Sequence, residues 1–371
     1  MALSARLARP ALVRNSAQIA DTALREWFRK SGKPELSKLT WGDYHAMLNT
    51  ITQSFEHVPE RMGFRYVHPV RLQNPELGLG KPYSAPVSYS DTQNGAEPVI
   101  AIGGLINTKH RFDFLANDAC QDLRVIALDL CGRGGSGWLA EQTDYSIDTH
   151  FELLRQFMDH LELSSCTLLG SSLGGSIAIR FASHFPDRVK RIILNDSGPY
   201  IPKKRRHRRS IAIARHYAFT TPEKMFRKTA ISMKHSGVAT DASLFYNQHY
   251  KTRWSEEENG RIYRHDIRAM LAYRAAATQN LDQWEYWDRI KCPVLLLHGL
   301  ASDALSHKTI NRMRINPLLS VIHVHGAGHT PSLSDGDLNQ WIADWVRDDK
   351  PYETDRYYQN PECYESIFYN A

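Results

Sequence analysis

The feature that most constrains the fold is a repeated alternation of short aliphatic runs with amphipathic segments. Apolar residues recur at helical spacing between two of the runs, at Ile147, Phe151, Leu154, Met158 and Leu161, and again after the last run, at Leu338, Trp341, Ile342 and Trp345. Short, unalternating aliphatic runs are typical of buried parallel strands. Strands that alternate with helices predict an α/β fold, a mostly parallel doubly wound sheet with helices on both faces. The aliphatic runs are residues 99–102, 125–128, 167–169, 192–194, 294–297 and 321–324.

The alternation is interrupted once, and the interruption predicts the domain organisation. Residues 199–290 read as mostly helical, with no strand pattern, and the pattern of strands returns near Cys292. An insertion of this size between two strands predicts a helical cap. We therefore expect an N-terminal extension (1–62, with a helix near 41–55), a core in two parts (63–198 and 291–348), the cap insertion (199–290) and a polar, tyrosine-rich tail (349–371).

The positive charge of the chain is concentrated in one segment. There are 46 Lys and Arg against 40 Asp and Glu, a net charge of +6, and residues 203–209 alone hold six of the bases. A charge confined to one segment argues against nucleic-acid binding by the fold as a whole, which usually spreads a basic stripe over a face. The segment could be a solvated helix face, a nuclear address, or a site for an anionic substrate, acyl carrier or membrane surface. The candidate contacts for an anionic partner are Lys203, Lys204, Arg205 and Arg206.

Cysteine content and the N-terminus bear on cofactors and location. Five cysteines lie far apart, at positions 120, 131, 166, 292 and 363. Their odd number and the lack of a Cys-x-x-Cys spacing argue against a disulfide scaffold or a zinc site, and we expect no metal or other cofactor and a reducing, cytoplasmic location. No apolar run approaches the roughly 20 residues of a transmembrane helix. Arg6, Arg9 and Arg14, with no acid nearby, resemble a mitochondrial presequence, the alternative location, although Pro10 interrupts a helix there.

The motif with the most chemical content is Gly170-Ser171-Ser172-Leu173-Gly174, a G-x-S-x-G between the predicted strand 167–169 and a helix that begins near Gly174. A sharp strand-to-helix turn raises the central serine hydroxyl above the sheet edge. Such a turn requires small residues at both glycine positions because larger side chains would collide. The motif predicts that Ser172 is a nucleophile; the alternative is a tight turn with an incidental serine.

Residues 99–346 resemble the α/β-hydrolase fold family, in which serine, acid and histidine follow one another along the chain. The resemblance implies that Asp303, in the loop after 294–297, is the acid and that His329, in Gly326-Ala327-Gly328-His329, is the base. Asp196, after the run 192–194, is the alternative acid.

Other segments extend the resemblance. Residues 129–136 resemble the glycine loop after the family's fourth strand, and 185–189 resemble the link after the nucleophile helix. The family often has His-Gly after the third strand, where this chain has Gly103-Gly104. Because oxyanion donors are backbone N–H groups, we still expect those of Leu105 and Leu173 to serve.

Other candidate residues have simpler explanations. The glycines of 132–135 lack the lysine of a phosphate-binding loop, so a tight turn is the better interpretation. His298, His323 and His325 lie at strand ends, where we expect structural roles.

The predicted residues suit acyl transfer to water. A serine hydroxyl needs a base to take its proton, and a carboxylate orients the imidazole of that base. We therefore expect a serine hydrolase that cleaves a carboxylic ester, or a related small acyl substrate, through an acyl-enzyme. The alternatives are a carbon–carbon bond hydrolase on the same triad and a non-catalytic hydrolase-like binding protein.

Overall fold

The computed structural model describes residues 15–32, 35–56, 59–68, 83–119, 122–233, 240–348 and 351–359. Cys120 and Cys363, and Arg6, Arg9 and Arg14 of the presequence-like segment, lie outside the described residues. Within the described residues, no helix is both long enough and apolar enough to cross a membrane.

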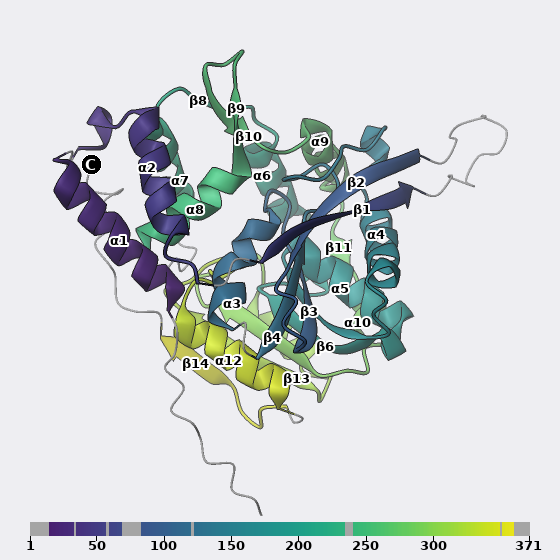
Figure 1. Ribbon diagram of the computed structural model, residues 1–371. Coiled ribbons are helices and arrows are strands. Elements are labelled where there is room, and N and C mark those ends of the chain that lie inside the picture. Colours follow the sequence, from purple (N-terminus) through teal and green to yellow (C-terminus); the bar gives the residue numbers. More distant parts are fainter. Residues whose placement is uncertain are drawn as a thin grey trace, which may run out of the picture.

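A mixed sheet forms the centre of the molecule (Figure 1). In the described part of the chain it has nine strands in the order β1-β2-β4-β3-β5-β6-β12-β13-β14. β1 pairs antiparallel with β2 and β2 antiparallel with β4, and every other pair is parallel. The predicted doubly wound, mostly parallel sheet is therefore confirmed. The strands are Glu60–His68 (β1), Tyr83–Asp91 (β2), Glu97–Ile102 (β3), Leu123–Leu128 (β4), Cys166–Ser171 (β5), Val189–Asn195 (β6), Val294–Gly299 (β12), Leu319–His325 (β13) and Arg356–Gln359 (β14).

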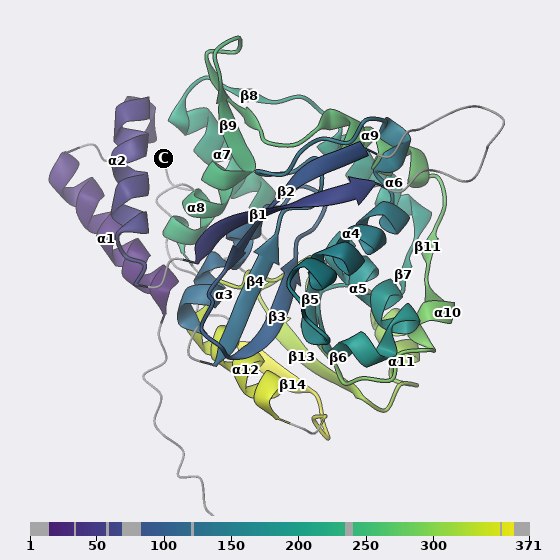
Figure 2. The same cartoon turned by 45° about the vertical axis from the view of Figure 1, so that its right-hand side comes forward.

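Buried side chains alternate between the two faces of the sheet, as the two-residue period of a strand requires. In β3, Ile100 and Ile102 belong to one hydrophobic cluster, whereas Val99 and Ala101 belong to a second. The two clusters place different helices on the two faces (Figure 2). The first is covered by α4 (Ile147–His160), α5 (Leu173–His184), α10 (Trp284–Trp287) and α11 (His307–Met313), and the second by η3 (Lys109–Phe112), α3 (Asp113–Asp118) and α12 (Gly336–Arg347).

Residues 199–290 form an insertion, because the strands on either side, β6 and β12, pair with each other. The segment is mostly helical, as expected, but it also contains short strands. β8, β9 and β10 form a small antiparallel sheet, and β7 pairs with β11. Its elements are β7 (Tyr200–Ile201), α6 (Lys203–Ile213), β8 (Ala218–Phe219), α7 (Pro222–Met233), α8 (Asp241–Lys251), β9 (Thr252–Ser255), β10 (Gly260–Tyr263), α9 (Ile267–Ala276), β11 (Leu281–Asp282) and α10.

The N-terminal segment packs on this insertion. It contains α1 (Ser16–Ser31), η1 (Leu36–Lys38) and α2 (Trp41–Thr52), which starts with a capping box between Thr40 and Asp43. Tyr44 of α2 shares a hydrophobic cluster with Phe226 and Phe245 of the insertion, and α1 and α2 lie beside α7 and α8 (Figures 1 and 2). The helix near 41–55 was expected.

Besides the short strands of the insertion, other regular elements were not predicted. Helix α1 and strands β1 and β2 lie where no element was expected, and β14 lies in the segment predicted as a tail. β14 extends the sheet because Tyr357 and Tyr358 pair in parallel register with His323 and Val324. The segment 349–371 is therefore not only a polar tail.

Candidate active site

The turn at Ser172 has the strained geometry that a nucleophile elbow needs. β5 ends at Ser171 and α5 begins at Leu173, and between them Ser172 has φ 53° and ψ −110°. A Cβ at Gly170 would lie 2.4 Å from the backbone nitrogen of Gly175, and one at Gly174 would lie 2.1 Å from the Ile102 carbonyl oxygen. Only glycine fits at these two places without a backbone shift.

His329 lies against the serine. Its Nε2 is 3.0 Å from Ser172 Oγ, and its Nδ1 is 2.7 Å from Asp196 Oδ2. Ser172 follows β5, Asp196 follows β6 and His329 follows β13. Because these strands are parallel, their carboxyl ends lie at one edge of the sheet, where ligands bind in open α/β sheets.

The structure places a different carboxylate on His329 from the one expected. Asp303 does follow β12, but its carboxylate pairs with Arg205 at 3.4 Å and with Arg208 of α6, whereas the carboxylate on His329 is that of Asp196. The end of β12 and the loop after it instead supply donors to Asp196, through the Gly299 N–H at 3.2 Å and Ser302 Oγ at 2.6 Å.

The direction of the Asp196 side chain follows from its backbone. Asp196 has φ 49°, in the left-handed region, and its N–H donates to the Leu297 carbonyl oxygen at 2.8 Å. The resemblance in the sequence favoured the acid after β12, whereas in the structure the carboxylate after β6 is the one that lies on His329. Asp196 was the alternative considered in the sequence.

The environment of His329 favours the neutral imidazole. Burial lowers the pKa of His329, the hydrogen bond and charge of Asp196 oppose that shift, and Arg205 and Arg209 reinforce it. A neutral imidazole can accept a proton from Ser172. The arrangement can therefore deliver a serine oxygen nucleophile and hold the proton at His329 Nε2.

The predicted oxyanion donors lie near the serine. Leu105 and Leu173 line the same pocket as Ser172. Leu173 is the first residue of α5, so its N–H has no carbonyl partner within the helix and lies at the positive end of the helix dipole. Their role as oxyanion donors stays a prediction.

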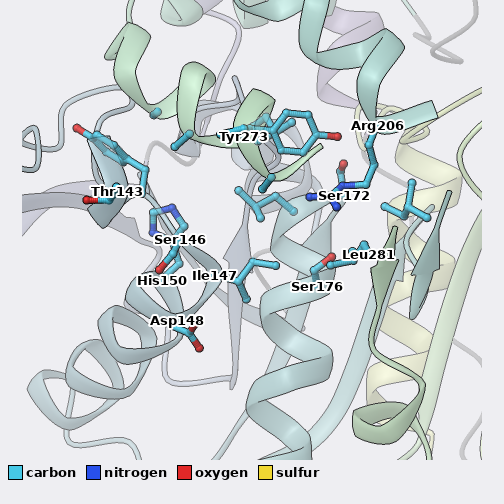
Figure 3. A pocket seen from close by; sticks show the side chains of 18 of the residues that line it. Thr143, Ser146, Ile147, Asp148, His150, Ser172, Ser176, Arg206, Tyr273 and Leu281 are labelled. Carbon is cyan, nitrogen blue, oxygen red and sulfur yellow. The ribbon is translucent and has the colours of Figure 1, made fainter. Parts of the chain in front are cut away.

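Two pockets meet at Ser172. The first, of about 470 Å³, is lined by Leu173 and by apolar side chains of the insertion (Figure 3). The second, of about 510 Å³, is lined by His329 and by several cations. Figure 3 shows Arg206 and Tyr273, from α6 and α9, on one side of the first pocket, with Ile147 and Ser176 on the opposite side.

The basic segment 203–209 divides between these pockets and solvent. In α6, Arg205 and Arg206 are buried and line pockets, whereas Lys203 and Lys204 are exposed and line neither. No sequence motif marks Lys251 or Arg111, which line the second pocket from α8 and η3. Arg209 belongs to the basic segment but was not among its four candidate contacts; it lies one helical turn after Arg205 and lines the second pocket.

The other candidate residues are engaged in local structure. Asp129 accepts hydrogen bonds from the Gly135 N–H and from Lys109 Nζ, both at 2.9 Å, so a carboxylate fills the glycine turn. His298 Nδ1 lies 2.9 Å from His323 Nδ1. His325 is exposed at the end of β13. In the described residues no group of His, Cys, Asp and Glu is arranged to hold a metal ion.

Comparison with known proteins identifies the family. Residues 97–335 match the model of the α/β hydrolase fold. The chain is 25% identical over 272 residues to a 3-hydroxybutyrate-oligomer hydrolase of Cupriavidus necator, which covers 67% of this chain and 88% of that protein. It is 28% identical over 145 residues to 2-hydroxy-6-oxononadienedioate/2-hydroxy-6-oxononatrienedioate hydrolase 1 of Pseudomonas putida, 36% of this chain and 47% of that one.

A solved structure agrees in fold. The α/β hydrolase from Novosphingobium aromaticivorans superimposes with a TM-score of 0.64 at 20% identity, covering 78% of this chain and 99% of that one. The family match spans more than half of the chain and coincides with the sheet and its serine turn. The chain therefore belongs to the α/β hydrolase fold family, as the resemblance in the sequence implied.

Proposed function

We propose that this protein is a serine hydrolase that cleaves a carboxylic ester through an acyl-enzyme, with Ser172 as nucleophile, His329 as base and Asp196 as the orienting acid. The observation that carries the proposal is the continuous chain of contacts from Ser172 Oγ to His329 at 3.0 Å and from His329 to Asp196 at 2.7 Å. A serine, a histidine and a buried carboxylate in this geometry form a nucleophile, its base and an orienting group.

The reaction would proceed in two steps. His329 Nε2 takes the hydroxyl proton as Ser172 Oγ attacks the acyl carbon, and the same proton passes to the leaving alcohol. Water then repeats the sequence and releases the acid. The N–H groups of Leu105 and Leu173 would stabilise the oxyanion, each donor lowering the barrier by roughly 3 kcal/mol. Residues 199–290 would act as the cap, since α6 and α9 line the apolar pocket beside Ser172.

The relatives support ester chemistry and leave one competitor. An oligomer of 3-hydroxybutyrate, the substrate in the printed name of the Cupriavidus relative, is joined by carboxylic ester bonds. Carbon–carbon bond cleavage is the second candidate, because the Pseudomonas relative is named for an oxo-dienedioate substrate. A vinylogous diketone substrate that turns over faster than every ester offered would favour this second candidate.

The test uses a fluorophosphonate probe and p-nitrophenyl esters of increasing chain length. We expect wild type to be labelled and active and Ser172→Ala to be neither, with turnover reduced to near background, on the order of 10⁶-fold as for other serine nucleophiles. Ser171→Ala is the matched control because its hydroxyl is buried on the adjacent residue and lies 3.2 Å from Asn195 Nδ2. Labelling that persists in folded Ser172→Ala would refute the proposal, and an unlabelled, inactive wild type would indicate a binding protein.

A further inference from the structure

The pocket on the histidine side of Ser172 carries an excess of positive charge. One carboxylate, that of Asp303, lines it among the described residues. The pocket of about 510 Å³ also contains the two reacting side chains, Ser172 and His329. An excess of cations beside a catalytic serine would favour binding of an anion. The cations that line the pocket are Arg111, Arg205, Arg208, Arg209 and Lys251.

Only some of these charges have partners. Arg205 and Arg208 pair with Asp303. By contrast, no side-chain hydrogen bond or ion pair joins Lys251 or Arg209 to any residue in the described ranges, although Lys251 is only 7% exposed.

A third cation in the pocket is paired with neutral oxygens. Arg111 is buried and donates to the backbone carbonyl oxygens of Thr330 and Pro331 at 2.9 and 3.1 Å, while its Nε has no partner among the described residues. Burying a cation without a counter-charge is costly. A bound anion would supply the missing counter-charge for Lys251, Arg209 and Arg111.

The apolar pocket on the other side of Ser172 has a different character. Its arginines are bound to carbonyl oxygens or acids of the protein: Arg206 donates to the Gln279 carbonyl oxygen at 2.6 Å, and Arg133 to that of Leu105 at 3.0 Å. Arg180 pairs with Asp148. This pocket therefore suits an uncharged acyl chain.

The position of His329 orients an ester between the two pockets. His329 must give its proton to the leaving oxygen, so the alcohol part of the ester lies on the side of His329. His329 lines the cationic pocket, whereas the N-terminal residue of α5, Leu173, lines the apolar one. The acyl part would then occupy the apolar pocket and the alcohol part the cationic pocket.

We propose that the substrate is an ester whose alcohol part carries a carboxylate, and that Lys251, Arg209 and Arg111 bind this carboxylate. The inference rests on the proposed serine hydrolase function. Water adds across the acyl carbon–oxygen bond, the alcohol oxygen takes its proton from His329, and the products are a carboxylic acid and a hydroxycarboxylic acid.

The electrostatics of Lys251 agree with this role. Burial, followed by the charges of Arg111 and Arg209, lowers the pKa of Lys251 to about 7. A carboxylate that arrives beside the amine favours its charged form, so binding draws a proton onto Lys251. The guanidinium groups can bind both carboxylate oxygens at once.

The experiment compares three synthetic esters with the full-length protein. They are 3-(butanoyloxy)butanoate, its uncharged amide 3-(butanoyloxy)butanamide, and monoethyl butanedioate, which places the carboxylate on the acyl side. We expect wild type to show kcat/KM at least about tenfold higher for the first ester than for the other two, since hydrogen bonds to charged groups contribute about 1.5–3 kcal/mol.

Two variants test the site. Lys251→Met and Arg209→Met should each reduce the ratio of kcat/KM between the carboxylate and its amide by about tenfold. Lys204→Met is the matched control, because Lys204 is an exposed cation of α6 that lines neither pocket, and it should keep the wild-type ratio. Lys251→Met should also raise the thermal midpoint of unfolding, because methionine removes a buried amine that has no side-chain partner in the described residues.

The outcomes distinguish this inference from the proposed function. If wild type is labelled at Ser172 and hydrolyses all three esters equally, the carboxylate site is refuted and the serine hydrolase stands. The carboxylate site is also refuted if the preference for the carboxylate ester over its amide persists in Lys251→Met and in Arg209→Met, a substitution of a half-buried side chain. If a butanoyl ester of glycerol phosphate shows a higher kcat/KM than 3-(butanoyloxy)butanoate, the choice of a carboxylate is overturned. An unlabelled and inactive wild type would refute the function itself.

Discussion

The strand ends of the sheet and the insertion between β6 and β12 face the same two pockets but contribute different kinds of side chain. The strand ends hold Ser172, Asp196 and His329, and His329 is within hydrogen-bond distance of the other two. The insertion contributes Arg209, Lys251 and apolar side chains that touch none of the three by hydrogen bond in the described part of the chain. Bond cleavage should therefore depend on the sheet, whereas the choice of substrate should depend on the insertion.

The largest expected effect separates Asp196 from Asp303. Asp196→Asn should lower kcat for every substrate by about 10⁴-fold, because the amide cannot stabilise the imidazolium and can fix the wrong tautomer. Asp303→Asn should change kcat by less than about tenfold, since its carboxylate pairs with Arg205 and Arg208 of the insertion. Both are measured with one neutral p-nitrophenyl ester. A dead Asp303→Asn beside an active Asp196→Asn would restore the acid expected from the sequence.

Much of the sheet could be predicted from the sequence because its central strands are buried on both faces. Each predicted aliphatic run falls in a strand, from β3 to β13. β2 was not predicted, because its burial alternates and Pro86 and Ser88 interrupt the aliphatic pattern. β14 has only one buried residue, Tyr358, and its polar sequence gives no strand signal.

The site was only partly predictable. Ser172 and His329 lie in short motifs whose backbone demands are visible as glycines. The choice of Asp196 depends on a left-handed backbone and on donors from a loop about a hundred residues away, which one sequence does not record. Lys251 ends a helix with no motif around it, and only its place in the pocket, beside Arg111 of η3 and Arg209 of α6, indicates a binding role.

The second prediction concerns the rigidity of the sheet side. Gly174→Ala should lower the free energy of unfolding by about 1–3 kcal/mol, because the new Cβ would lie 2.1 Å from the Ile102 carbonyl oxygen and force a backbone shift. Gly42→Ala is the matched control: Gly42 is an exposed helical glycine whose Cβ would meet Thr40 Oγ1 at 3.6 Å, so the variant should be about 0.5–1 kcal/mol more stable. Urea unfolding measures both, and equal stability of the two variants would contradict the tight elbow.

The third prediction concerns chain-length preference in the insertion. Ala272 of α9 lines the apolar pocket, so Ala272→Phe should shorten the longest acyl chain that is accepted. Each methylene excluded from the pocket should lower kcat/KM by about fourfold, since burying one is worth about 0.8 kcal/mol. Ile267→Phe, at an exposed position of the same helix, should leave the dependence of kcat/KM on p-nitrophenyl ester chain length unchanged. If both variants show the same chain-length dependence, the acyl chain does not lie in this pocket.

The smallest expected effect is a shift in pH dependence, and it links the two regions. His329 must be neutral to act as base, and burial, with Arg205 and Arg209 of α6 adding to it, lowers the pKa of His329. A lowered pKa keeps the imidazole neutral at pH values below the ordinary value of about 6.5. For a neutral ester, kcat/KM should therefore stay constant down to about pH 6.5 and fall only at lower pH, and this fall is the acid limb of the pH profile.

Removing a positive neighbour favours the protonated imidazole, so Arg205→Met should move the acid limb of the kcat/KM profile to higher pH. Asp303 would then keep Arg208 as its partner, and its charge would act on His329 in the same upward direction. Lys204→Met, exposed on the same helix, should leave the limb in place. An acid limb that does not move in Arg205→Met would mean that the insertion selects the substrate without tuning the base.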